Sequence, residues 1–110
     1  ETHHLNKKDA PSGTAIQLAK DIIQVNTHYK GWKIGNQKET DLLPIEVTRR
    51  DNVSGIHEIT AVSNEDTITL RHEAGGLDGF ALGSVLAAEF LYGKKGVFTV
   101  KDLLRNALQL

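Results

Sequence analysis

Residues 56–73 read IHEITAVSNEDTITLRHE, and this stretch decides the fold class of the 110-residue chain. Ile56–Val62 and Thr67–Glu73 are rich in β-branched residues, and residues 64–66 (Asn-Glu-Asp) between them are typical of a turn. The two runs therefore predict an antiparallel hairpin. Because successive side chains of a strand point to opposite faces, one face of its second strand carries Ile68, Leu70 and His72.

The segment before this hairpin predicts a helix. Apolar residues recur there at helical spacing, at Ala15, Ile16, Ala19, Ile22 and Ile23. We therefore expect a helix from about Thr14 to Val25, with Ser12 or Thr14 as its N-cap. Residues 26–44 show little periodicity and predict a long irregular connection, a type of loop that is often functional. Ile45–Arg50 has the composition of a further strand.

The segment after the hairpin predicts two helices. Phe80–Leu91 is helical in pattern and apolar over much of its circumference, so we expect it to be buried. Thr99 and Asp102 form a capping box ahead of a last helix that ends at Leu108. Together these elements predict an α+β domain, with a small mixed β-sheet, helices packed on one face and the other face used for oligomerisation.

The composition excludes several classes of protein. Lys and Arg total 13 against 14 Asp and Glu, which gives a net charge of -1 and no basic excess for nucleic acid. No run approaches the roughly 18 apolar residues of a membrane span. The absence of cysteine is compatible with a reducing, cytoplasmic location. Because the chain opens at Glu1 and contains no methionine, we expect it to be a piece of a longer protein.

Polar side chains with chemical potential are densest at the start of the chain, at His3, His4, Lys7, Asp9, Ser12 and Thr14. One interpretation is a solvated, frayed terminus. A metal site is disfavoured, because adjacent residues of an extended segment point His3 and His4 to opposite faces. The other histidines, His28, His57 and His72, show no helix-face spacing with this pair.

An anion site is the third interpretation. Ser12-Gly13-Thr14 presents free backbone N–H groups at the positive end of a helix dipole. Gly13 lets a ligand approach the backbone closely, and the two hydroxyls add donors. His4 and Lys7 would add charge and further donors to bind a carboxylate or phosphate, and His3 could donate a proton near neutral pH.

These residues carry a resemblance to a known family. Residues 1–15 read ETHHLNKKDAPSGTA, which is similar to the signature of dihydrodipicolinate reductases. A second block agrees with the same family, at Arg49, Gly55, His57, Ile68, His72, Ala74, residues 80–83, Ala87, Ala88 and residues 96–104. The likeness covers nearly the whole chain and is weakest over residues 21–44.

The resemblance implies a site and a reaction. His3 and Lys7 would be the catalytic, proton-handling pair, and His4, Ser12, Gly13 and Thr14 would hold a small cyclic dicarboxylate. The chain would be the C-terminal substrate-binding and tetramerisation domain of a cytoplasmic homotetramer in lysine and diaminopimelate biosynthesis. The resemblance further implies that NADH or NADPH would be bound mainly by an N-terminal Rossmann domain outside this chain, so the isolated piece is expected to be inactive. The chain itself has no G-x-G-x-x-G motif that would bind a dinucleotide pyrophosphate in the usual way.

Two positions depart from the family pattern, and two other functions stay open. Family members usually carry Arg near Leu77 and Gly at the position of Asp51. The first departure removes a positive charge and the second places a side chain in a turn. The rival functions are a non-catalytic module that binds small anions and a purely structural assembly domain.

Overall fold

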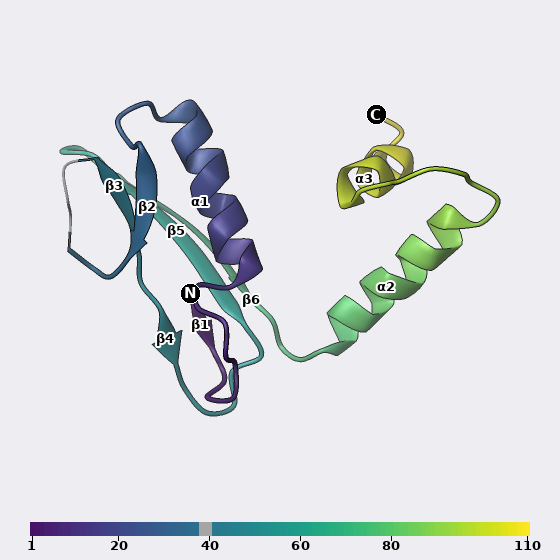
Figure 1. Ribbon diagram of the computed structural model, residues 1–110, viewed down its shortest axis with the longest axis horizontal. Helices are drawn as coiled ribbons and strands as arrows, with labels where there is room; N and C mark the ends of the chain where they lie inside the picture. Colours follow the sequence, from purple (N-terminus) through teal and green to yellow (C-terminus); the bar gives the residue numbers. More distant parts are fainter. Residues whose placement is uncertain (38–40) are drawn as a thin grey trace. The chain divides into compact units, whose positions relative to one another are not determined.

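The computed structural model describes residues 1–37 and 41–110 (Figure 1). The chain divides into two compact units, Glu1–Gly75 and Gly76–Leu110. The first unit holds all the strands and one helix, and the second holds two helices. The predicted α+β class and the mixed sheet are confirmed, whereas a face used for oligomerisation stays a prediction.

The predicted hairpin organises the first unit. β5 (Ile56–Val62) and β6 (Thr67–Glu73) pair antiparallel, in a register that runs from Ile56 opposite Glu73 to Val62 opposite Thr67. The Ser63 hydroxyl oxygen accepts hydrogen bonds from the backbone N–H groups of Glu65 and Asp66 and so closes the turn. The bounds of both strands agree with the prediction from β-branched runs around a polar turn.

Two short strands complete this sheet at its other edge. β1 (Thr2–His3) lies between β4 (Thr48–Arg49) and β5, parallel to the first and antiparallel to the second. The strand order is therefore β4-β1-β5-β6. A two-residue strand is too short to show alternation, so β1 could not be predicted. It fixes the polar start of the chain in the sheet and corrects the interpretation of a frayed terminus.

The prediction of an irregular connection over residues 26–44 is wrong. β2 (Gly31–Ile34) and β3 (Leu42–Ile45) pair parallel and form a separate two-stranded sheet. Four residues give no reliable period, and pairing with a partner about ten residues away decides such strands. The single strand expected over Ile45–Arg50 is divided, since β3 ends at Ile45 and β4 occupies only Thr48–Arg49.

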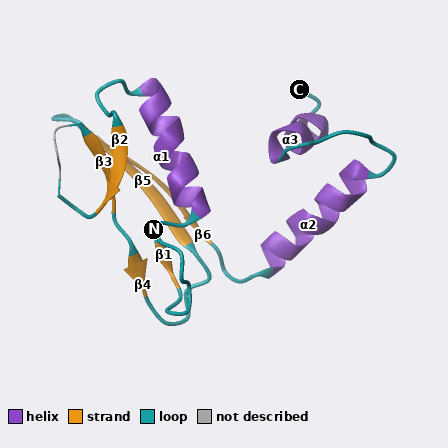
Figure 2. Cartoon of the chain, viewed as in Figure 1, coloured by secondary structure: helices purple, strands orange, loops and turns teal. Residues whose placement is uncertain are grey.

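Helix α1 (Gly13–Val25) covers the small sheet and builds the core of the first unit. Ser12 is the N-cap, and its hydroxyl oxygen accepts a hydrogen bond from Ala15 N–H at 3.1 Å. α1 lies beside β2 and β3 (Figure 2), because its small residues let the helix approach closely. The buried cluster and the partly buried residues packed on it are Ala15, Ala19 and Ile45, with Trp32, Leu43 and Val47.

The second unit contains α2 (Asp78–Leu91) and α3 (Val100–Leu108). The predicted capping box is confirmed, since the Thr99 N–H donates to the Asp102 carboxylate at 2.7 Å. The expectation that Phe80–Leu91 is buried is wrong for the single chain, because no residue of α2 is buried and Phe80 is 55% exposed. Its unit offers only α3 as a partner, too little surface to cover an apolar circumference. No helix within the described residues has the length and apolar character to cross a membrane.

The small core predicts a sharp response to overpacking. Ala19 is 3% exposed on the side of α1 that faces the buried cluster. Ala19→Leu should lower the free energy of unfolding by about 1–3 kcal/mol, as forced repacking does in close-packed cores. Urea unfolding followed by fluorescence of Trp32, the single tryptophan, measures the change. Lys20→Leu introduces the same side chain at an exposed position of α1 and should leave stability nearly unchanged; equal effects would contradict this packing.

Candidate functional site

The site is built where β1 meets β5 and the start of α1. β1 carries His3 into the sheet, and the His3 carbonyl accepts a hydrogen bond from Arg50 N–H at 2.9 Å. His3 is 8% exposed, so a strongly polar ring lies inside the unit. Its Nε2 atom lies only 3.2 Å from where a Cβ on Gly55 would stand. The absence of a side chain at Gly55 therefore makes room for the ring.

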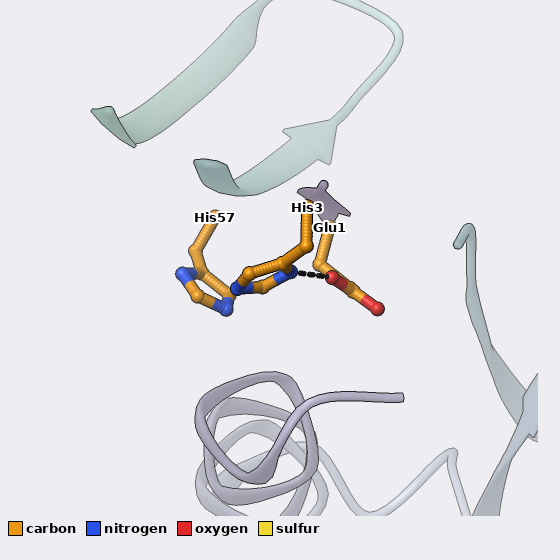
Figure 3. Close-up of side chains that lie close together, drawn as sticks. All are labelled: Glu1, His3 and His57. Carbon is orange, nitrogen blue, oxygen red and sulfur yellow. Dashed lines mark hydrogen bonds and ion pairs between the residues drawn. The ribbon is translucent and has the colours of Figure 1, made fainter. Parts of the chain in front are cut away.

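A buried carboxylate holds the other nitrogen of His3. His3 Nδ1 is hydrogen-bonded to Glu1 Oε2 (Figure 3). Arg49 Nη1 donates to the other oxygen, Glu1 Oε1, at 3.0 Å. The Glu1 side chain is 1% exposed, and burial by itself would raise its pKa. The hydrogen bonds and charges of His3 and Arg49 outweigh burial, so the pKa of Glu1 lies below its usual value. Glu1 is thus an ionised carboxylate with a cation on each side when His3 is protonated.

A second histidine links this group to the helix start. The His57 ring packs edge-on against the His3 ring (Figure 3). The two ring centroids are 5.1 Å apart. His57 Nε2 shares a hydrogen bond of 2.8 Å with the Ser12 hydroxyl, which also caps α1. Burial, followed by the charge of His3, lowers the pKa of His57 below its usual value. Its neutral form is favoured, which keeps a second positive charge away from His3.

Lys7 stands on the loop between β1 and α1. Its ammonium pairs with Asp9 Oδ1 at 2.9 Å, and the Lys7 N–H donates to the His4 carbonyl at 3.2 Å to close a turn. Arg49 Nη2 donates to the Asp9 carbonyl at 2.8 Å. The pairing with Lys7 is the main cause of the lowered pKa of Asp9. The same arginine therefore contacts both the carboxylate behind His3 and the loop that carries Lys7.

The predicted anion-binding residues are at the exposed start of α1. Gly13 and Thr14 are exposed, as is His4, whereas Ser12 is 4% exposed. The Ala15 N–H is used by the Ser12 hydroxyl and the Ile16 N–H by the Ser12 carbonyl. Among the described residues, the N–H groups of Gly13 and Thr14 make no such bond and are open to a ligand. The open donors are thus fewer than a helix start offers before capping.

Glu1, His3 and His57 also have the composition of a metal site. One ligand atom from each can be chosen so that all three lie within 4.8 Å of one another. Each is already hydrogen-bonded, however: Glu1 to His3 and Arg49, and His57 to Ser12. A cation would have to displace these bonds and stand near the Arg49 guanidinium. The geometry therefore favours a hydrogen-bonded network over a metal centre.

Sequence reasoning missed three members of this network, Glu1, Arg49 and His57. Arg49 and His57 belong to the family resemblance, but nothing in their spacing from His3 along the sequence indicates a contact. Arg49 and His57 lie 46 and 54 positions after His3 along the chain, and the pairing of β1 with β4 and β5 brings both to it.

The fold and site together define an α+β domain whose histidine pair lies against a capped, exposed helix start. A protein family described as "Dihydrodipicolinate reductase, C-terminus" matches residues 1–104. The chain belongs to this family of dihydrodipicolinate reductase C-terminal domains.

Curated relatives agree with this assignment. A 4-hydroxy-tetrahydrodipicolinate reductase of Christiangramia forsetii is 48% identical over 106 residues, covering 96% of this chain and 44% of the relative. The protein of the same name from Rickettsia rickettsii is 38% identical over 96% of this chain and 45% of the relative. The protein of the same name from Caldanaerobacter subterraneus is 34% identical over 96% of this chain and 45% of the relative. The chain thus spans less than half the length of these relatives.

The lowered pKa of Glu1 predicts a specific loss of stability in acid. A carboxyl whose pKa is lower in the folded state stabilises it fully above the unfolded-state pKa. That contribution is lost as the pH falls through the folded-state pKa. Glu1→Gln should therefore lower the free energy of unfolding near neutral pH, and the difference from the parent should shrink towards acid. Urea unfolding of the parent and of Glu1→Gln, repeated from neutral to acid pH, measures the free energy of unfolding of each.

Glu58→Gln is the matched control for this experiment. The Glu58 carboxylate also pairs with an arginine, Arg71, at 3.0 Å, but the two side chains are 41% and 46% exposed. Its removal should change stability little at any pH. A deficit of Glu1→Gln that stays constant from neutral to acid pH would contradict the assignment of an ionised, stabilising Glu1.

Proposed function

We propose that this chain is the substrate-binding half of an NAD(P)H-dependent reductase that converts 4-hydroxy-tetrahydrodipicolinate to tetrahydrodipicolinate in lysine and diaminopimelate biosynthesis. The observation that carries the proposal is that the Ser12 hydroxyl, which caps α1, bonds His57, whose ring in turn packs against His3. A proton-transfer group near an anion-binding helix start suits a cyclic dicarboxylate whose ring carbon must take up a proton. The names of the relatives support the same reaction.

In this proposal the open N–H groups of Gly13 and Thr14 bind one carboxylate of the substrate. The positive end of the α1 dipole favours the negative charge, and the Thr14 hydroxyl and the exposed His4 ring add donors. Ser12 has a different part, because its hydroxyl is occupied by Ala15 and His57. It holds the helix start in place beside the histidine pair and so shapes the site.

Reduction of the substrate ring needs a hydride and a proton. The nicotinamide cofactor would supply the hydride to C4 after the hydroxyl there is lost, and it would be bound mainly by residues outside this chain. The enamine-like carbon that results takes up a proton, which His3 delivers or controls. The Lys7 ammonium, paired with Asp9, attracts the dicarboxylate and supports the same step.

A homotetramer is part of the proposal, because the chain leaves much apolar surface exposed. Ile68 and Leu70 share one face of β6 and are each 68% exposed, and within the second unit Leu82 on α2 is 60% exposed. Exposed apolar surface of this kind is covered in symmetric assemblies. Sedimentation of the complete reductase as a strict monomer at high concentration would overturn this part.

Titration with pyridine-2,6-dicarboxylate tests the binding site. We expect selective perturbation of the Gly13 and Thr14 amide resonances, because these are the open donors of α1. Thr14→Val should weaken binding, whereas Thr60→Val, at an exposed position of β5, should not. Equal binding of acetate or sulfate at the same concentration would favour an anion-binding module. No perturbation by any anion would favour an assembly domain.

Kinetics of the complete reductase test the residue roles. His3→Gln should lower kcat by roughly 10²- to 10⁴-fold, the contribution of a positioned acid or base. Lys7→Ala should lower kcat and raise KM, because a cation that holds the ground state also supports the transition state. Lys20→Ala, on the exposed side of α1, is the control and should change neither. A His3 variant that keeps the full rate across neutral pH would remove the catalytic assignment.

A further inference from the structure

The Glu1 carboxylate uses both of its oxygens on two different groups. Oε2 accepts from His3 Nδ1, and Oε1 accepts from Arg49 Nη1 at 3.0 Å. Exposed fractions of 1% for the Glu1 side chain and 18% for Arg49 show that water competes little for these bonds. Charge-assisted hydrogen bonds in such a place are shorter and stronger than neutral ones. Glu1 is therefore held firmly by Arg49 and in turn restrains the His3 ring.

This contact determines which nitrogen of His3 carries a hydrogen. A carboxylate can only accept, so Nδ1 must be the donor, and the neutral ring then has an unprotonated Nε2. Nε2 is the atom that lies over Gly55, on the side of the His57 ring. The carboxylate thus directs proton exchange to Nε2.

Arg49 also bonds a second acceptor besides this carboxylate. Its second terminal nitrogen donates to the Asp9 carbonyl at 2.8 Å, and the Asp9 side chain pairs with Lys7 at 2.9 Å. One planar guanidinium therefore fixes the carboxylate behind His3 and the backbone of the loop beside Lys7. A lysine at position 49 could not bond both acceptors in this geometry, because it presents a single nitrogen.

We propose that Glu1 and Arg49 are positioning residues of this site. Glu1 sets the tautomer and orientation of His3, and Arg49 holds Glu1 and the Lys7 loop in register with each other. The proposal rests on the proposed function, in which His3 and Lys7 handle the proton. Glu1 and Arg49 would act through His3 and the Lys7 loop and would not themselves contact the substrate.

The tautomer of His3 is the direct readout, and it does not depend on activity. In the 110-residue chain labelled with 15N-histidine, long-range 15N–1H spectra above the titration range should show a protonated Nδ1 and a pyridine-like Nε2 for His3. Glu1→Gln should give a mixture of tautomers, because the amide can accept from Nδ1–H or donate to a bare Nδ1. Glu58→Gln, the exposed arginine-paired control, should leave the His3 signals unchanged. A single unchanged tautomer in Glu1→Gln would overturn the proposal.

Kinetics of the complete reductase give the second readout. Glu1→Gln and Arg49→Lys should each lower kcat by roughly 10- to 100-fold with a smaller change in KM, the loss typical when a group that orients a functional histidine is removed. Because Glu1 acts through His3, Glu1→Gln should have almost no further effect in a His3→Gln background. Full additivity of the two substitutions would show that Glu1 stabilises only the fold and would overturn the proposal.

Arg49→Lys keeps the positive charge, and it tests the proposal independently if Glu1→Gln fails to fold. It should lower kcat like Glu1→Gln and alter the His3 tautomer less, since one bond to Glu1 can persist. The outcomes also separate the two proposals. If His3→Gln lowers kcat but Glu1→Gln and Arg49→Lys do not, the function stands and the positioning role fails. If His3→Gln has no effect while the tautomer still follows Glu1, the catalytic assignment fails instead.

Discussion

The hydrogen-bonded series from Arg49 through Glu1 to His3 is the constraint on which the rest of the site depends. A carboxylate that is almost fully buried must be paired, since an uncompensated charge there would cost several kcal/mol. The pairing joins Arg49 of β4 to the residue that precedes β1, and the second terminal nitrogen of Arg49 bonds the loop before α1. Strand order, loop position and ring orientation are therefore coupled. A change in any one of them would leave a buried charge without its partner.

Ser12 is the second junction of the fold, and it joins helix to sheet. Its hydroxyl caps α1 through Ala15 and bonds His57 on β5, so the helix start cannot shift without loosening the histidine pair. The capped start leaves Gly13 and Thr14 as the open donors. Ser12 therefore fixes the open N–H groups of α1 relative to His57, whose ring packs against His3.

The two units differ in how much of their apolar surface and how many of their polar groups are buried and paired within the unit. The first has a small buried cluster and a fully hydrogen-bonded polar network, in which no described buried side-chain N or O atom lacks a partner. The second consists of α2 and α3, and neither helix has a buried residue. Such helices gain little from intrinsic propensity alone and are stabilised mainly when their apolar faces are packed. The apolar faces of α2 and α3 therefore stay largely uncovered within their own unit.

The sequence by itself determined the elements whose signals are local. The β5–β6 hairpin and the capping box at Thr99 and Asp102 depend on neighbours a few positions away, and both are confirmed. The sequence narrows the N-cap to Ser12 or Thr14, and the structure selects Ser12. The helix-start residues Gly13 and Thr14 belong with them, although their role in binding stays a prediction. Tertiary structure alone decided β1, the β2–β3 pair and the exposure of α2. It also brought Glu1, Arg49 and His57 to His3, because strand pairing joins residues whose separation along the chain carries no periodic signal.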